Sequence, residues 1–283
     1  MKQEFFTIIS NEALVPATSE SETVSGSMAA SKNKSASGMR PVAAVYKMVL
    51  SGNTSAITAP GQFVNIKLDG FFLRRPISVC DVSSAETAEA PAGNSGMLTI
   101  IYKIVGNGTE AMSKMKAGRQ LDILTGLGNG YNTTESGENP LLIGGGAGVP
   151  PLYLLAKILL KEGKKPTVLM GFNTAAEIFY KEEFEKLGVR VVLTTADGSC
   201  GIKGFVSDAM PNLEYSYIYA CGPEPMLKAI DAAAPAGLGG QFSFEERMGC
   251  GFGACMGCSC KTKYGNRRIC KDGPVLSREE IIW

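Results

Sequence analysis

The sequence of 283 residues contains no histidine. This absence removes the side chain that most often serves as a general base near neutral pH, and also a common ligand of zinc and of Rieske-type iron–sulfur centres. We therefore expect no catalytic acid–base side chain in this chain. Its function should need little proton transfer, or should obtain it from a partner.

An excess of charge and long apolar runs are also absent. The 28 Lys and Arg residues nearly balance 27 Asp and Glu residues. This balance argues against binding to nucleic acids or membrane surfaces, because a protein that binds either needs a concentrated positive charge. No run approaches the roughly 18 apolar residues that cross a bilayer. The first ten residues, "MKQEFFTIIS", lack the apolar core of a signal peptide. We expect a cytoplasmic protein whose eight cysteines bind metal rather than form disulfides.

Residues 1–137 carry the pattern of an antiparallel β-domain. Short runs rich in Val, Ile and aromatic residues alternate with Gly, Pro, Asn and Ser, which predicts a barrel of about six strands. A short helix is expected at 109–116, with Thr109 as its N-cap. The serine-rich stretch 16–38 and the milder stretch 83–96 hold too few apolar residues to form a core, so we expect surface loops there.

Residues 138–237 change to alternating strands and helices, which predicts a parallel sheet covered by helices. Helices are expected at 150–163 and 176–188. Residues 238–283 form a third region, which is small, rich in cysteine and without periodicity of its own. We expect this region to depend on something other than a hydrophobic core.

The cysteines of the third region have a specific spacing. Cys250, Cys255, Cys258 and Cys270 fit C-x4-C-x2-C followed by a distant cysteine, which is the plant-type [2Fe–2S] pattern. Structural zinc is less favoured, because it usually uses two short cysteine knuckles and Cys270 has no companion. Cys260 is then the spare thiol. It could replace Cys258 in principle, but only Cys258 preserves the two-residue gap.

Two motifs of the second region favour a nucleotide. In "LLIGGGAGVPP" (141–151) a strand ends in glycines and enters a helix, so free N–H groups and the positive helix end converge as in a pyrophosphate site. The motif is neither a P-loop nor a complete dinucleotide fingerprint, and a purely structural glycine turn is the alternative. "YACGPEPM" (219–226) ends a later strand and should bring Cys221 and Gly222 to the same cleft.

A third motif, "LRRPISV" (73–79), lies in the β-domain. Arg75 offers planar donors suited to a phosphate, and Ser78 could form a hydrogen bond with a ring edge or polyol. By itself, however, an Arg-Pro pair is more typical of a strand edge with a solvated charge.

Taken in order, these motifs resemble those of ferredoxin-reductase-like flavoproteins, most closely the electron-transfer subunits of type B dihydroorotate dehydrogenase. The resemblance runs nearly end to end apart from the serine-rich insertion. Its carriers are "RRPIS", "IIYKIVGNGT", "GLGNGY", "GGGAGVPPL", "TADGS", "CGPEPML", "ERMGCGFGACMGCSCKT" and "CKDGPV". The cysteine loop followed by "CKDGP" is the most specific of them, whereas "RPIS" is shared by many reductases.

The resemblance implies three modules: an FAD-binding antiparallel barrel, an NAD-binding parallel-sheet domain and a small [2Fe–2S] region. The implied flavin contacts are Arg75, Pro76, Ile77, Ser78, Ile101, Tyr102, Lys103, Gly108 and Thr109. The implied NAD contacts are Gly146, Gly148, Cys221 and Gly222, and the implied cluster ligands are Cys250, Cys255, Cys258 and Cys270.

The resemblance also implies a function. A flavin accepts a hydride from NADH and delivers single electrons to the cluster. Nothing in the chain resembles a barrel for FMN and dihydroorotate, so that chemistry is expected on a partner, an FMN-containing catalytic subunit, in a heterotetramer of pyrimidine biosynthesis. One alternative is a subunit of a ferredoxin:NADP or sulfide-type oxidoreductase, although "GFNTAAE" (171–177) offers no arginine for a 2′-phosphate. Another is a zinc-stabilised, nucleotide-binding regulatory protein.

Overall fold

The computed structural model describes residues 1–17, 42–83 and 96–283. Residues 18–38 of the serine-rich stretch and 84–95 of the second expected loop lie outside the described residues. In the described part of the chain, no helix is long and apolar enough to cross a membrane.

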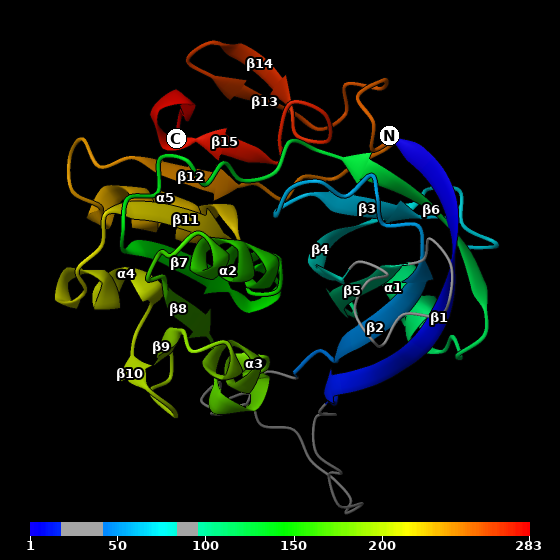
Figure 1. Ribbon diagram of the computed structural model, residues 1–283, viewed down its shortest axis with the longest axis horizontal. Helices are drawn as coiled ribbons and strands as arrows, with labels where there is room; N and C mark the ends of the chain where they lie inside the picture. The colour runs from blue at the N-terminus through cyan, green and yellow to red at the C-terminus, as the bar shows by residue number, and fades with distance from the viewer. Residues whose placement is uncertain (18–41, 84–95) are drawn as a thin grey trace, which may run out of the picture.

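The first half of the chain forms a closed antiparallel barrel (Figure 1). Its strands follow one another in the order β1 (Lys2–Val15), β2 (Val45–Gly52), β5 (Gly96–Lys103), β4 (Arg75–Ser83), β3 (Phe63–Ile66) and β6 (Gln120–Leu127). Alternate residues such as Phe6, Ile8, Met48, Val79 and Ile100 fill its interior. The six-stranded barrel confirms the prediction. The expected short helix is present as α1 (Asn107–Ser113), but its N-cap is Gly106 and Thr109 lies at the third helical position, so the prediction of Thr109 as the N-cap is wrong.

The second half forms a seven-stranded sheet. Its order is β10 (Ile202–Lys203), β9 (Arg190–Thr195), β8 (Thr167–Phe172), β7 (Pro140–Gly145), β11 (Tyr217–Cys221), β12 (Gly240–Ser243) and β15 (Val275–Ser277). All neighbours are parallel except β15, which runs antiparallel to β12. The prediction of a parallel sheet covered by helices is confirmed. On one face lie α2 (Pro151–Lys161) and α3 (Lys181–Lys186), and on the other lie α4 (Val206–Ala209) and α5 (Glu224–Ala233).

The prediction of a continuous helix at 176–188 is wrong in one respect. The chain forms a single 3-10 turn at Ala175–Glu177, becomes extended at Ile178, and enters α3 only after Tyr180. Tyr180 has a left-handed φ of 65°. Its ring is buried with Phe184 in the core between sheet and barrel, and this tertiary packing overrides the local helical pattern.

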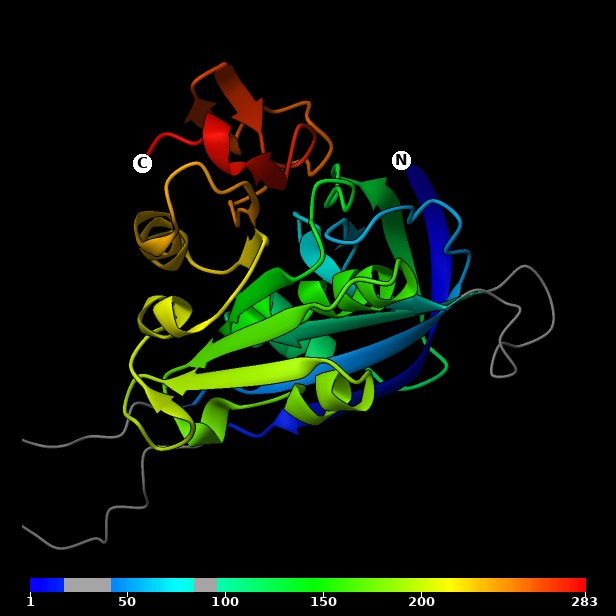
Figure 2. The ribbon, with the colours of Figure 1, turned by 60° about the vertical axis from the view of Figure 1, so that its left-hand side comes forward.

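The C-terminal region is better packed than its sequence suggested. The hairpin of β13 (Ser259–Thr262) and β14 (Gly265–Arg268) lies at one end of the molecule, above β15 (Figures 1 and 2). Cys258, Ile269 and Cys270 belong to the same hydrophobic cluster as α5 and β12. The expectation of a region without a core is therefore wrong, because β15 extends the large sheet and shares its core.

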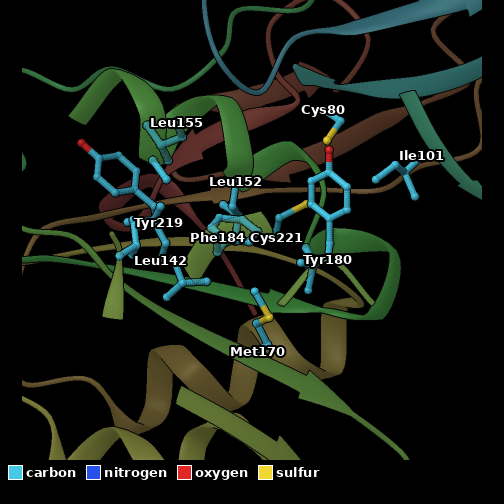
Figure 3. Close-up of a cluster of buried hydrophobic side chains, with 14 of the residues drawn as sticks. Cys80, Ile101, Leu142, Leu152, Leu155, Met170, Tyr180, Phe184, Tyr219 and Cys221 are labelled. Carbon is cyan, nitrogen blue, oxygen red and sulfur yellow. The ribbon is translucent and has the colours of Figure 1, made fainter. Parts of the chain in front are cut away.

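The barrel and the sheet domain meet through β4 and α2. Lys157 of α2 donates to both carboxylate oxygens of Asp81, at 2.7 and 2.8 Å. Cys80, which precedes Asp81 on β4, is fully buried and forms a side-chain hydrogen bond with Tyr180. Figure 3 shows this thiol and hydroxyl facing each other. These contacts fix the strand that carries the "RRPIS" motif against the sheet domain.

Candidate functional site

Arg75 lies over the start of α1. A Cβ atom added at Gly108 would lie 2.1 Å from the Arg75 Nε, so the guanidinium group can approach this turn only because residue 108 has no side chain. The hydroxyl of Thr109 caps the turn, accepting from the N–H of Val105 at 2.9 Å and donating to the Gly106 carbonyl at 3.0 Å. The structure thus brings Arg75, Gly108 and Thr109 together, with the Thr109 hydroxyl occupied locally.

The rest of the motif alternates across β4. Pro76 pairs with Asn65 and Ser78 pairs with Phe63, and paired residues share one face of a sheet. Because Phe63 belongs to the core shared with the cysteine region, this face points out of the barrel. Ile77 packs instead against the barrel interior, so it can reach a ligand on the outer face only through its backbone.

The neighbouring strand β5 shows the same alternation. Tyr102 is buried with the barrel interior, where its hydroxyl donates to Asn11 Oδ1 at 2.9 Å and burial raises its pKa well above 10. Ile101 and Lys103 face outward: Ile101 joins the core beneath α2, and Lys103 reaches the wall of a large cleft. Of these three side chains, Lys103 has the polar group best placed for an anionic ligand.

That cleft, of about 650 Å³, lies at the carboxyl ends of the parallel strands. Such edges are where open α/β sheets bind their ligands. Its walls carry Gly145, Gly146, Ala147, Asn173, Glu177, Pro223, Met226 and Glu245, opposite Lys103 and Val105 from the barrel. A concave site of this size, shared by two domains, suits a dinucleotide.

Gly148, Cys221 and Gly222 lie directly behind this wall and do not line it. A Cβ atom at Gly148 would lie 2.1 Å from the carbonyl oxygen of Cys221, so the glycine loop packs closely against the end of β11. The Cys221 thiol is buried, and this burial raises its pKa far above the usual range. A reactive thiolate is therefore not available at Cys221.

Two acidic residues of the cleft were not predicted from sequence. Glu177 accepts from the side-chain amide of Asn173 at 3.0 Å. Glu245 follows β12, and desolvation in the cleft raises the pKa of its carboxyl group. Glu245 could have been found from its position just after a parallel strand, but β12 itself was not predicted.

The four spaced cysteines gather as two pairs. The N–H of Cys255 donates to the Cys250 sulfur at 3.4 Å, and the N–H of Cys270 donates to the Cys258 sulfur at 3.4 Å. Arg268 holds the loop to the hairpin: it donates to the Gly253 carbonyl at 3.0 Å and pairs with Asp272. Cys260 lies apart on β13, where it packs against the shared core.

This arrangement suits a binuclear cluster. Such a cluster takes four thiolates, two on each iron, and the loop offers two pairs. The two pairs, Cys250 with Cys255 and Cys258 with Cys270, match the two irons of [2Fe–2S].

In cluster-free protein, Cys250 should be the most reactive of these thiols at pH 7. Burial works to raise its pKa, but N–H donors from Phe252, Cys255 and Ala254 outweigh it and lower the pKa to about 6. The thiolate is then present above pH 6 and is lost as the pH falls through that value. Peptide mapping after iodoacetamide pulses from pH 5 to 8 should show half-maximal labelling of Cys250 near pH 6. Labelling that first rises near pH 8.5 would contradict this assignment.

The barrel, the parallel sheet and the cysteine region together define a ferredoxin-reductase-like flavoprotein with an added iron–sulfur module. A solved structure of an NADH-dependent reduced ferredoxin–NADP oxidoreductase matches 98% of the chain and 89% of its own, with a TM-score of 0.77 and 27% identity. The FAD/NAD-binding domain of a nitric oxide dioxygenase from Vibrio cholerae matches 84% of the chain and 97% of its own, with a TM-score of 0.60. At 18% identity, the latter supports the fold alone.

Sequence relatives narrow this class to one family. Residues 245–282 match the iron–sulfur cluster binding domain of dihydroorotate dehydrogenase B, and residues 142–232 match the oxidoreductase NAD-binding domain. The dihydroorotate dehydrogenase B (NAD(+)) electron transfer subunit of Fusobacterium nucleatum is 44% identical over 83% of this chain and 92% of its own. That of a Geobacillus species is 40% identical over 86% and 95%. The chain belongs to the family of dihydroorotate dehydrogenase B electron transfer subunits.

Proposed function

We propose that this chain passes electrons between NAD(H) and a dihydroorotate dehydrogenase catalytic subunit, using FAD and a [2Fe–2S] cluster, in the cytoplasmic synthesis of pyrimidines. The observation that carries the proposal is the position of the cysteine loop. Cys250 lies against Asn65 of β3, and Asn65 pairs with Pro76 of the "RRPIS" strand. The proposed cluster and flavin sites thus share one face of the barrel.

The proposed flavin site uses Arg75 with Gly108 and Thr109 for the phosphates, and the outer face of Pro76 and Ser78 for the ring. Ile77 would contribute backbone groups. On the neighbouring strand, Ile101 packs on the outer face and Tyr102 in the barrel interior, and together they would hold that strand in place beside the flavin. Arg75 is suited to phosphate because its planar guanidinium can make two parallel, charge-assisted hydrogen bonds. The close approach of the Arg75 guanidinium to Gly108 places this cation at the start of α1, and this is the feature that fits an FAD phosphate.

The proposed NAD site is the cleft between the domains. Gly146 would let the dinucleotide approach the backbone, while Gly148, Cys221 and Gly222 would hold that wall in place through their close packing. Lys103 would supply a positive charge from the barrel side. The rigid contact between Lys157 and Asp81 would keep the two reacting rings aligned, and such alignment is a major part of catalysis in redox sites.

Bound FAD accepts an electron pair as hydride and can release the electrons one at a time, which a [2Fe–2S] cluster requires. The chain's own part is to hold these groups in order along one face. Cys250, Cys255, Cys258 and Cys270 would hold the cluster as thiolates, and the N–H donors around the Cys250 sulfur would tune it, since hydrogen bonds to sulfur change a cluster's reduction potential.

The partner would dock over the cysteine loop. Phe252, Met256 and Tyr264 expose large apolar side chains around it, and Tyr264 is 72% exposed. An exposed apolar group beside a redox centre suits an interface. We propose that the occupant is the FMN-containing catalytic subunit, and that the complex is a heterotetramer.

Co-expression with a dihydroorotate dehydrogenase catalytic subunit tests the proposal. The two chains should copurify as a complex of two copies each, which carries FAD, FMN, iron and acid-labile sulfide and couples dihydroorotate oxidation to NAD+ reduction. Absence of flavin and sulfide from the purified chain would overturn the proposal. A complex that forms only with a ferredoxin-dependent partner would favour the alternative oxidoreductase.

NADH should be preferred over NADPH by at least about 100-fold in kcat/KM. Among the described residues, the cleft is lined by Glu177, Glu245 and a single basic residue, Lys103, so an added 2′-phosphate meets like charge without a guanidinium partner there. Glu177→Gln should narrow this preference severalfold by removing one of the two carboxylates. Steady-state rates with both cofactors measure the ratio, and a native preference for NADPH would contradict it.

A further inference from the structure

Asn65 lies on the outer face of β3, between the proposed flavin and cluster sites. Its neighbours Val64 and Ile66 point into the barrel core, so the Asn65 side chain points outward. It is only 1% exposed. Two residues earlier, Phe63 packs in the same core as Cys258 and Cys270.

The side-chain amide of Asn65 is bound to the cysteine loop. Its Nδ2 donates to the carbonyl oxygen of Cys250 at 3.2 Å. A Cβ atom at Gly251 would lie 2.2 Å from this nitrogen, and Gly251 also has a φ of 78°. Glycine is therefore required at 251 for both conformation and space, and the loop is fitted closely to this amide.

The backbone of Asn65 is also held. Arg74 donates to the Asn65 carbonyl at 3.3 Å and to the Asp122 carbonyl at 3.0 Å, and forms an ion pair with the Asp122 carboxylate at 2.9 Å. Asn65 cannot move outward without disturbing three strands, because β3 lies between β4 and β6. The amide is a rigid anchor rather than a flexible surface contact.

The second polar atom of the same amide is the oxygen Oδ1. Asn65 Oδ1 is buried and has no hydrogen-bond partner within residues 1–17, 42–83 and 96–283. Buried polar atoms in native proteins nearly always find a partner. Asn65 lies on the face of the barrel that also carries Pro76 and Ser78, so this oxygen is available as an acceptor on that face.

We propose that Asn65 is a positioning residue for electron transfer from the flavin to the cluster. It holds the Cys250 end of the loop against the strand pair that carries the flavin motif, and so fixes the separation and orientation of the two redox groups. The inference rests on the proposed function. Asn65 itself does not carry electrons.

Two near-isosteric variants test this role in the cofactor-loaded complex. Asn65→Asp keeps the shape and removes the donor to Cys250, whereas Asn65→Leu removes both polar atoms. Stopped-flow spectra should show NADH reducing the flavin within twofold of the native rate, while the following reduction of the cluster slows at least tenfold. The electron paramagnetic resonance signal of the reduced cluster should also change shape, because the Cys250 backbone is no longer fixed.

Asn11→Asp is the matched control. Asn11 is another asparagine of the barrel, but its amide binds the Met112 and Met115 carbonyls and the Tyr102 hydroxyl, away from the cysteine loop. It should lower thermal stability and leave cluster reduction unchanged. Cluster reduction within twofold of native in both Asn65 variants, with full iron and flavin content, would overturn the proposal.

Hydrogen exchange separates this inference from the proposed function. In the purified full-length chain, amides 251–257 should exchange at least tenfold faster in both Asn65 variants than in the native protein or in Asn11→Asp. This result is expected even if the partner is another oxidoreductase. Unchanged exchange would show that Asn65 does not anchor the loop, whatever the electron acceptor is.

Discussion

Replacing any one of Cys250, Cys255, Cys258 and Cys270 by serine should reduce electron delivery to the catalytic subunit at least 100-fold, while NADH still bleaches the flavin within twofold of the native rate. A serine hydroxyl stays protonated where a thiol ionises, so the site loses one of four anionic ligands. The proposed flavin and dinucleotide sites do not include these side chains, so the hydride step should survive. Stopped-flow spectra of the complex separate the two steps.

Cys260→Ser is the control for this series. Cys260 lies on β13 outside both thiol pairs and packs partly buried against the shared core, so its replacement should keep iron, acid-labile sulfide and delivery near native levels. Cys258 and Cys270 are also core residues, and their variants should lose thermal stability as well. Undiminished delivery in all four cluster variants, or loss only in Cys260→Ser, would refute the assignment of the cluster ligands.

The sequence was most informative where short spacing sets the chemistry. The C-x4-C-x2-C loop lies within one turn-rich segment, so the spacing of Cys250, Cys255 and Cys258 limits their geometry before any tertiary contact forms. The barrel was predictable for a similar reason, because strands such as β2 and β5 are short runs rich in Val, Ile and Tyr, and their residues are all buried or half-buried in the structure.

Contacts between distant segments could not be predicted in this way. β15 joins the large sheet from the far end of the chain, and three residues carry too little pattern to indicate a strand. The resemblance predicts Lys103 as a flavin contact, but its outward direction on β5 brings it to the wall of the cleft that we propose for NAD. Asn65 has an unremarkable sequence context, and its meaning comes from Cys250, 185 positions away.

The sequence alone does not distinguish the roles of the adjacent arginines Arg74 and Arg75 in "LRRPIS", because these roles depend on contacts with distant segments. Their replacement tests the proposed flavin site. Arg75→Met should weaken FAD binding by roughly 10- to 150-fold, the equivalent of a lost hydrogen bond to a charged group, with little change in the stability of the flavin-free protein. Arg75 makes no ion pair with the described residues, and its guanidinium lies over Gly108. Fluorescence titration of flavin-free protein with FAD measures the change.

Arg74→Met should give the opposite result. Arg74 forms a largely buried ion pair with Asp122 and donates to two backbone carbonyls. Its loss removes these contacts, although the Asp122 carbonyl still accepts from the Lys67 N–H and the Asp122 carboxylate from the Gln3 amide. The free energy of unfolding should therefore fall by about 1–3 kcal/mol. FAD affinity of the folded fraction should stay within about threefold of native. If urea unfolding and FAD titration instead show that Arg74→Met loses the flavin and Arg75→Met loses stability, the proposed phosphate contact belongs to the other arginine. The flavin site would then have to lie on the β6 side of β3.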